Sequence, residues 1–165
     1  MENMKQQPLE VLLQILQDSL EQKLLVLTAI EQKSKEQSVL VANPNVALED
    51  IDKNMEEKSQ LIDKLTRLDG GFETLYNSIR EELQNKKDAY KPQILKIQDL
   101  ISKVMEKSAS IEVIEARNKS AIEGIFRNRK KELQHKRNVS TVARQYYQSA
   151  NKLTVIPPQF LDKKK

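Results

Sequence analysis

Residue types that catalyse reactions or bind metal ions are scarce in this chain, which contains one histidine and no cysteine. The histidine, His135, lies among charged residues near the end of a predicted helix, where we interpret it as a solvated side chain rather than a catalytic base. The absence of cysteine excludes disulfides and thiolate metal sites. The composition therefore argues against an enzyme.

Acidic side chains gather where a long helix is predicted to begin, at Glu49, Asp50, Asp52, Glu56 and Glu57. Negative charge in the first turns complements the positive end of the helix dipole. A metal site would need several of these carboxylates on one face, but helical residues one or two apart point in different directions. We therefore expect neither a metal nor another cofactor.

The paired glycines Gly70 and Gly71 lack the lysine and the serine or threonine of a phosphate-binding loop. Apolar heptad spacing continues across them, from Leu65 through Phe72 to Ile79, which favours a tolerated kink over a loop. Two adjacent glycines cost about 2 kcal/mol of helix propensity relative to alanine. They either form a hinge or allow a close backbone approach to another helix, and we favour the close approach.

Lys and Arg are concentrated in residues 127–137, at the end of a predicted helix. Residues 127–165 carry a net charge of +9, and the rest of the chain carries −5. The basic cluster can complement the helix dipole in solvent, bind an acidic protein, or bind nucleic acid. We favour the first and expect no nucleic acid, because aromatic residues are not interleaved with the charges. Membrane-surface binding would need an apolar face, and the cluster offers only Leu133.

Apolar residues recur every three or four positions through about the first 135 residues, as in amphipathic helices that pack on one another. Between Leu48 and Leu83 they fall on two lines with seven-residue steps, like the a and d positions of a coiled coil. One line contains Leu48, Met55, Ile62, Tyr76 and Leu83, and the other contains Ile51, Leu65, Phe72 and Ile79. We predict an all-α fold, an elongated antiparallel bundle of three long helices with a short C-terminal helical segment.

The first helix is expected to begin at Pro8 or Leu9 and to fade after Glu36. Its apolar triplet repeats after eleven residues, a step that keeps the seam nearly straight. Further apolar residues widen this stripe, which predicts contact with at least two neighbouring helices. The triplet is Leu9, Leu13 and Leu16, followed by Leu20, Leu24 and Leu27.

Residues 38–47 are predicted to connect the first two helices, with Val39–Val41 as a helix end or an apolar loop. Asn43 and Pro44 are a candidate N-cap and first turn for the second helix, and Asn45 is the competing cap. The second helix is expected from about Leu48 to Lys87.

A third helix is expected to follow a boundary at residues 88–92, with Pro92 in its first turn. Its seam becomes polar at Glu115 and Asn118, and a polar seam residue often determines register or partner number. Helices of about 40 residues would each be about 60 Å long, which predicts a slender rod.

The periodic pattern divides the chain into a helical body, residues 1–137, and a basic, partly mobile tail, residues 138–165. The tail concentrates apolar side chains that either fold back onto the bundle or order on binding a partner. The candidate partner-binding residues are Val139, Val142, Tyr146, Tyr147, Phe160 and Leu161.

The terminal sequence Phe160-Leu-Asp-Lys-Lys-Lys165 resembles the aromatic, apolar, Asp, basic ending of FlgN-type flagellar export chaperones. The Tyr146-Tyr147 pair after a basic helix end, the stretch Glu115–Lys119, the Glu-Lys-rich repeat at Glu56–Lys58 and the order of long helices are similar too. Gly70-Gly71 and Pro157-Pro158 depart from that pattern.

This resemblance implies a cytoplasmic chaperone that binds C-terminal helical segments of hook-associated proteins and delivers them to the flagellar export gate. It also implies that the C-terminal third, above all Tyr146 and Tyr147, contacts client and gate. Two alternatives are a structural coiled-coil scaffold and a related secretion chaperone, such as the filament-cap chaperone.

Other features of the sequence bear on localisation and assembly. The polar N-terminus lacks the apolar core of a secretory signal. The longest apolar-rich stretch, Leu24–Ile30, is too short to span a membrane, so we expect no membrane insertion. The wide apolar stripes require either closure within the chain or a homodimer.

Overall fold

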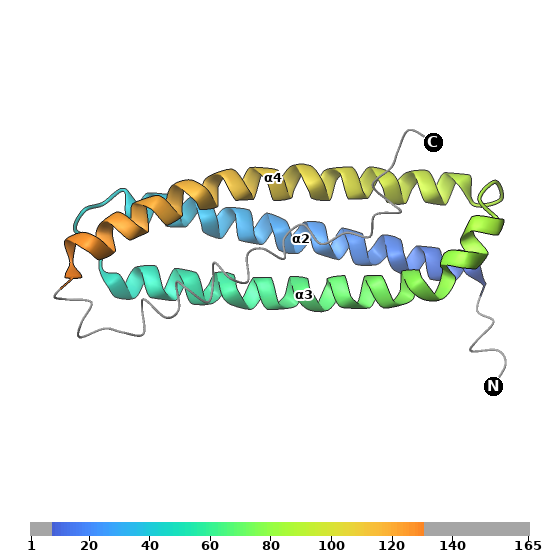
Figure 1. Cartoon of the computed structure of the whole chain (residues 1–165), viewed down its shortest axis with the longest axis horizontal. Coiled ribbons are helices and arrows are strands. Elements are labelled where there is room, and N and C mark those ends of the chain that lie inside the picture. The colour runs from blue at the N-terminus through green and yellow to red at the C-terminus, as the bar shows by residue number, and fades with distance from the viewer. Residues whose placement is uncertain (1–7, 131–165) are drawn as a thin grey trace.

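The computed structural model describes residues 8–130, which form three long helices joined by two short connections. These are α2 (Leu9–Val41), α3 (Leu48–Asn85) and α4 (Lys91–Asn128). Consecutive helices run antiparallel, and α3 and α4 each lie alongside α2 in a slender rod (Figure 1). The prediction of an elongated all-α bundle is confirmed for this part of the chain. The predicted C-terminal helical segment lies outside the described residues.

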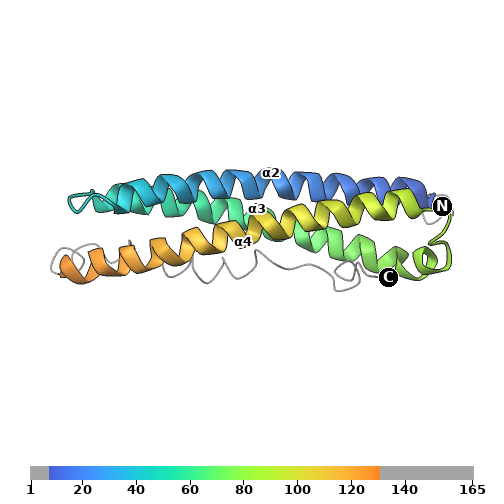
Figure 2. The same ribbon diagram turned by 90° about the horizontal axis from the view of Figure 1, so that it is seen from above.

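Helix α2 is the central element, because it packs against both α3 and α4. In Figure 1 it lies between them, and Figure 2 shows both neighbours toward the same side of α2. Contact with two helices is what the wide stripe of α2 predicts, so that expectation is confirmed. By contrast, no Cα atom of α3 lies within 8 Å of one in α4.

Helix boundaries match the sequence pattern at some ends and depart from it at others. Helix α2 extends to Val41, so the prediction that it fades after Glu36 is wrong. The helix continues because Leu40 and Val41 pack against buried apolar residues of the connection, α3 and α4. Ala47, not Asn43 or Asn45, precedes the first residue of α3. The side chain of Asn43 instead accepts a hydrogen bond from the Asn45 N–H (2.9 Å), which stabilises the connection.

Helix α3 passes through Gly70 and Gly71 without a loop, and neither glycine has a positive φ. The favoured explanation, a close backbone approach to another helix, is wrong, because an added Cβ would meet nothing within 4 Å at either position. Phe72 follows immediately and is buried. The apolar seam therefore holds the helix together where its local propensity is weakest.

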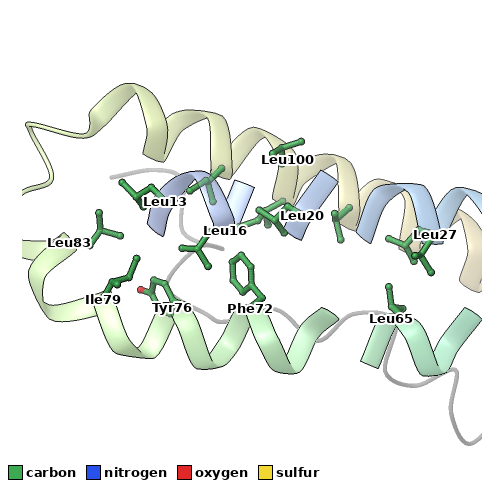
Figure 3. Packing of buried hydrophobic residues seen from close by; sticks show 14 of the residues in the cluster. Leu13, Leu16, Leu20, Leu27, Leu65, Phe72, Tyr76, Ile79, Leu83 and Leu100 are labelled. Carbon is green, nitrogen blue, oxygen red and sulfur yellow. The ribbon is translucent and has the colours of Figure 1, made fainter. Parts of the chain in front are cut away.

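Two apolar clusters form the interior. The larger, here called the long core, extends from Leu9 to Ile30 on α2, from Ile62 to Leu83 on α3 and from Ile97 to Ile111 on α4. Its side chains point inward from all three helices (Figure 3). The rings of Phe72 and Tyr76 are stacked, with their centroids 6.5 Å apart. The smaller, here called the end core, consists of Val46, Leu48, Ile51, Met55 and Ile122.

Candidate helix-binding site

The partner-binding residues predicted from the sequence all lie in the tail. Val139, Val142, Tyr146, Tyr147, Phe160 and Leu161 are therefore outside the described residues, as is His135. The candidate site is built instead from the three helices.

The side on which α3 and α4 face each other, here called the α3–α4 side, is the first feature of this site. Each of these helices carries a narrow apolar seam that faces α2, as the a and d lines predict. Their backbones nevertheless keep apart along their whole length. Three helices placed in this way match three of the four positions of a four-helix bundle. The seam residues of α3 and α4 are buried, however, without a fourth helix among the described residues.

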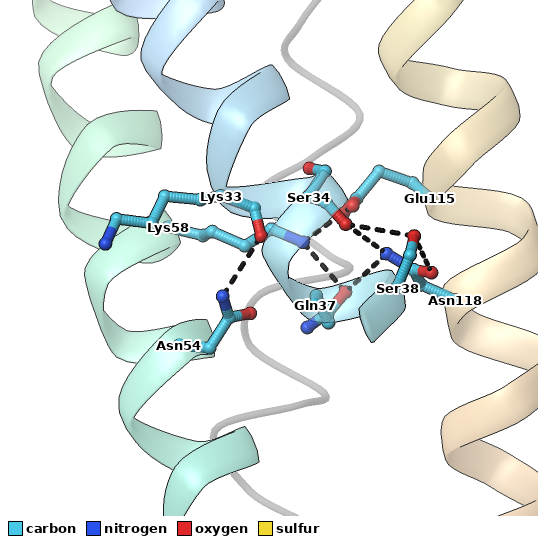
Figure 4. Close-up of polar contacts among 8 residues, drawn as sticks. All are labelled: Lys33, Ser34, Gln37, Ser38, Asn54, Lys58, Glu115 and Asn118. Atoms are coloured by element: carbon cyan, nitrogen blue, oxygen red, sulfur yellow. Dashed lines mark hydrogen bonds and ion pairs between the residues drawn. The ribbon is translucent and has the colours of Figure 1, made fainter. Parts of the chain in front are cut away.

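A group of polar side chains, here called the polar layer, crosses the bundle between the long core and the end core (Figure 4). Its members are Ser34, Gln37 and Ser38 of α2, Asn54 and Lys58 of α3, and Glu115 and Asn118 of α4. All of them are buried except Ser38, which is half-buried. Their backbones come from three different helices, so only the tertiary structure brings them together.

Lys58 is at the centre of the polar layer, with a side chain that is 0% exposed. Its Nζ donates to Glu115 Oε1 at 2.6 Å and to Gln37 Oε1 at 2.9 Å. Because Lys58 belongs to α3 and Glu115 to α4, this ion pair joins the two helices whose backbones do not meet. Side-chain contacts thus connect α3 and α4 at this level of the rod.

The amide of Asn118 extends the network onto α2. Its Nδ2 donates to Gln37 Oε1 (3.0 Å) and to the Ser34 carbonyl oxygen (2.9 Å), and its Oδ1 accepts from Ser38 Oγ (2.8 Å). On the other flank, Asn54 Nδ2 donates to the carbonyl oxygen of Lys33 (3.0 Å). The sequence-based expectation that Glu115 and Asn118 are polar seam residues is confirmed, since both are buried.

Burial controls the electrostatics of this network. It lowers the pKa of Lys58 to about 8, against the opposing effect of the nearby Glu115 carboxylate. A buried ion pair of this kind contributes little net stability, but removing one partner leaves an uncompensated charge.

Four polar atoms of the layer are buried and have no hydrogen-bond partner among the described residues. They are Ser34 Oγ, Gln37 Nε2, Asn54 Oδ1 and Glu115 Oε2. A buried donor or acceptor that is left without a partner typically costs about 1–3 kcal/mol. Such a concentration at one level makes the layer an energetically costly part of the interior.

A second charged pair lies within the long core. Lys23 Nζ contacts Asp69 Oδ1 at 2.7 Å, and both side chains are largely buried. Burial raises the pKa of Asp69, and the Lys23 charge opposes that shift. The pair therefore links α2 to α3 close to the two glycines.

Sequence reasoning missed Lys58 and Asp69, although a signal was present. The seven-residue line Ile51, Leu65 has a gap at Lys58, and the line Ile62, Tyr76 has a gap at Asp69. Charged residues that interrupt otherwise apolar seam lines must be paired when buried. Each gap is therefore a sequence-level marker of a buried ion pair.

Part of the basic cluster 127–137 has an internal role that the sequence did not suggest. The guanidinium of Arg129 donates hydrogen bonds to the backbone carbonyl oxygens of Pro44 and Val46. It thereby ties the end of α4 to the connection between α2 and α3. Arg127 and Lys130 are exposed, and the rest of the cluster lies outside the described residues.

Searches of the described residues found neither a membrane span nor a metal site. No helix within residues 8–130 has an apolar stretch long enough to cross a bilayer. No group of three or more metal-ligating side chains that could hold an ion occurs in the same range. Comparison of the chain with models of known protein families, with curated proteins and with solved structures finds no match.

Proposed function

We propose that this protein is a chaperone that binds a helical segment of a client protein on its α3–α4 side. The observation that carries the proposal is the separation of α3 and α4, both of which pack on α2 with apolar seams facing inward. A client helix in the fourth position would extend both seams at once. This is the helix-in-groove mode of recognition, which uses anchors at i, i+3 or i+4, and i+7.

The chemistry of such a client follows from this mode of binding. An unassembled subunit with a free amphipathic terminal helix exposes an apolar stripe that would otherwise self-associate. A bundle with long parallel seams can shield that stripe, and release restores it for assembly. The long, narrow shape of the rod suits a client segment that is itself a long helix.

The clients that we propose are the flagellar hook-associated proteins, bound through their C-terminal helices in the cytoplasm and delivered to the flagellar export gate. Support for this choice is the sequence resemblance to FlgN-type chaperones. The stretch Glu115–Lys119, which is part of that resemblance, includes two members of the polar layer. The all-α bundle is compatible with such a chaperone.

Co-expression with a client segment tests the proposal. The full chain should co-purify with the C-terminal segment of a hook-associated protein as a stoichiometric complex in size-exclusion chromatography. An internal segment of the same protein, matched in length, serves as the control and should not bind. Absence of a complex with the C-terminal segment would contradict the proposal.

The tail provides a second test. Replacing both Tyr146 and Tyr147 with alanine should weaken client or gate binding and leave the helix content measured by circular dichroism unchanged. A structural scaffold would instead keep every interaction in a form shortened to residues 1–137. Unaltered binding by the double variant would remove these two residues from the proposed site.

A further inference from the structure

The outer face of α2 carries apolar side chains that the bundle does not use. Helices α3 and α4 both lie toward one side of α2, so its other side has no helix against it among the described residues (Figure 2). Of the seven large apolar side chains that are exposed within residues 8–130, four lie on α2 and none on α3. The four, here called the outer strip, are Val11, Ile15, Leu25 and Val39.

The outer strip follows the same heptad repeat as the buried seam of α2. Residues 11, 18, 25, 32 and 39 occupy the heptad position farthest from the buried lines, and all five are exposed. This position is polar in a helix that packs only within its own bundle. In α2 it reads Val, Asp, Leu, Gln, Val, and Leu25 and Val39 are 65% and 75% exposed. Single exposed apolar residues are normal, whereas recurrence at one heptad position is the pattern of a helix-packing seam.

We propose that the outer strip is a homodimer interface, in which the α2 helices of two copies pack antiparallel about a two-fold axis at Leu25. The contact would extend from Val11 to Val39, over about 42 Å of helix. This inference concerns a different face from the proposed client site and does not depend on the proposed function.

The spacing of the strip is self-complementary, as a two-fold interface requires. An antiparallel pairing about Leu25 brings together residues that lie equally far from it on the two copies. Val11 then faces Val39 of the second copy, and Leu25 faces its own counterpart, which gives three apolar layers. Asp18 faces Gln32 of the second copy, whose carboxamide can donate to the carboxylate. Apolar residues thus meet apolar ones, and polar residues meet polar ones.

The charges beside the strip favour the antiparallel direction. Lys35 precedes Val39 by four residues, and helical side chains tilt toward the N-terminus of their own helix. In the antiparallel pair this tilt directs Lys35 toward Asp18 of the second copy, and the symmetry repeats the contact. A parallel pair in register would instead place Asp18 against Asp18 and Lys35 against Lys35, which is repulsive.

A second copy fits the strip better than residues 131–165 do. The partner helix must repeat apolar residues at the spacing of Val11, Leu25 and Val39, and α2 itself has that spacing. The periodic pattern of the sequence stops after residue 137, so the tail does not supply it. With three apolar layers the contact belongs to the weak, reversible class, and we expect a micromolar Kd. The dimer would leave the α3–α4 sides of both copies uncovered.

Sedimentation equilibrium of the full chain, from about 1 to about 300 μM, measures this association. Leu25→Glu places two carboxylates at the two-fold axis and should weaken the dimer by about tenfold or more. Helix content should not change, because Leu25 is exposed. Val113→Glu is the matched control, since Val113 is an exposed apolar residue of α4, and this variant should associate like the wild type.

Introduced cysteines test the direction of the pairing, because the chain has no cysteine of its own. Leu25→Cys should form a disulfide-linked dimer on mild oxidation. Val11→Cys and Val39→Cys should cross-link efficiently when they are mixed and poorly when each is oxidised alone. Val113→Cys serves as the control for random collision.

Several results would overturn the inference. A chain that remains monomeric at every concentration has no such interface, and a dimer that Leu25→Glu leaves intact, or that Val113→Glu abolishes, uses another face. Efficient cross-linking of Val11→Cys to itself would show a parallel pair. A monomer in which Leu25→Cys reacts with a thiol reagent only after residues 131–165 are removed would assign the strip to that segment. The client co-purification tests the proposed function separately, so either idea can fail without the other.

Discussion

The long core and the end core differ in how they are held together, although the same three helices form both. The long core contains inward-facing residues along most of the rod, and the buried Lys23–Asp69 ion pair lies within its length. The end core has five buried residues and depends on Arg129, which ties α4 to the connection between α2 and α3. Between them lies the polar layer.

This difference indicates how a bundle of narrow seams can combine stability with a defined register. The free energy gained by burying apolar side chains is roughly proportional to the buried area and has no preferred direction. It therefore tolerates shifts in register between helices. A polar layer adds little net stability, but it penalises every arrangement in which its members lose their partners. The long core therefore provides most of the stability, and the polar layer determines the register in which the three helices pack.

The largest expected effect comes from breaking the central ion pair that separates the two cores. Glu115→Leu leaves the Lys58 charge buried without its partner and should lower the free energy of unfolding by about 3–5 kcal/mol. Lys58→Met combined with Glu115→Leu removes both charges and should be neutral or stabilising. Urea denaturation of the single and double variants measures the difference. Similar losses in both would show that the ion pair itself stabilises the fold.

Truncation of one side chain in each core tests whether the long core and the end core unfold as one unit. Leu27→Ala in the long core should cost about 2–5 kcal/mol of global stability, because Leu27 is 0% exposed. Met55→Ala in the end core likewise truncates a buried apolar side chain. It should mainly lower the free energy of local opening near the start of α3 rather than the free energy of global unfolding. Native-state hydrogen exchange separates the two cases. Equal loss of protection along the whole rod in both variants would mean that the layer does not divide the cores.

The pKa of Lys58 makes stability depend on pH in a predictable direction. Burial lowers this pKa to about 8 in the folded state, below its ordinary value of 10.5. Between these values the unfolded chain binds more protons, so the free energy of unfolding should rise with pH, by about 1–3 kcal/mol. Urea denaturation from pH 7.5 to 9.5 measures the rise.

The variant with both Lys58→Met and Glu115→Leu is the control for this pH dependence. It should show a flatter profile than the wild type over the same range, because the titrating pair is gone. A wild-type stability that falls between pH 8 and 9.5 would contradict the assignment. Measurements stay below pH 10 because burial raises the pKa of Tyr76, whose ionisation acts in the opposite direction.

The smallest expected effect compares one glycine from each region. Gly71→Ala should raise stability by about 0.5–1 kcal/mol, because the backbone is helical and a Cβ meets nothing within 4 Å. Gly124→Ala, near the end core, places a Cβ 3.8 Å from Arg127 Nη2. Its gain in stability should be smaller than that of Gly71→Ala, because we expect the end-core end of the rod to open locally. Thermal denaturation ranks the two variants. A loss of stability in Gly71→Ala would restore the hinge explanation for this glycine pair.

The fold class could be predicted from the sequence because helical periodicity is a local property. Leucine triplets, heptad lines and Pro92 in the first turn of α4 each depend on neighbours within a few residues, and the structure confirms the three helices that they predict. The wide stripe of α2 likewise indicated two neighbours. The boundaries at Glu36 and Asn43 failed because tertiary contacts of Leu40 and Val41 extend α2.

The candidate site was only partly predictable, because its residues are far apart in the chain. Glu115 and Asn118 were recognised as polar seam positions, but nothing local identifies Lys58 as the partner of Glu115, 57 residues away. The role of Arg129 depends in the same way on a connection 83 residues earlier.

The sequence by itself determined where the helices form and which face of each is apolar, since both follow from the spacing of side chains along one helix. Only the tertiary structure decided that α2 lies between its neighbours and that α3 and α4 stay apart. It also decided that the charged residues in the seams, Lys58 and Asp69, form buried ion pairs with distant residues. Those outcomes depend on which distant residues meet, and burial makes a charge tolerable only where its partner is within reach.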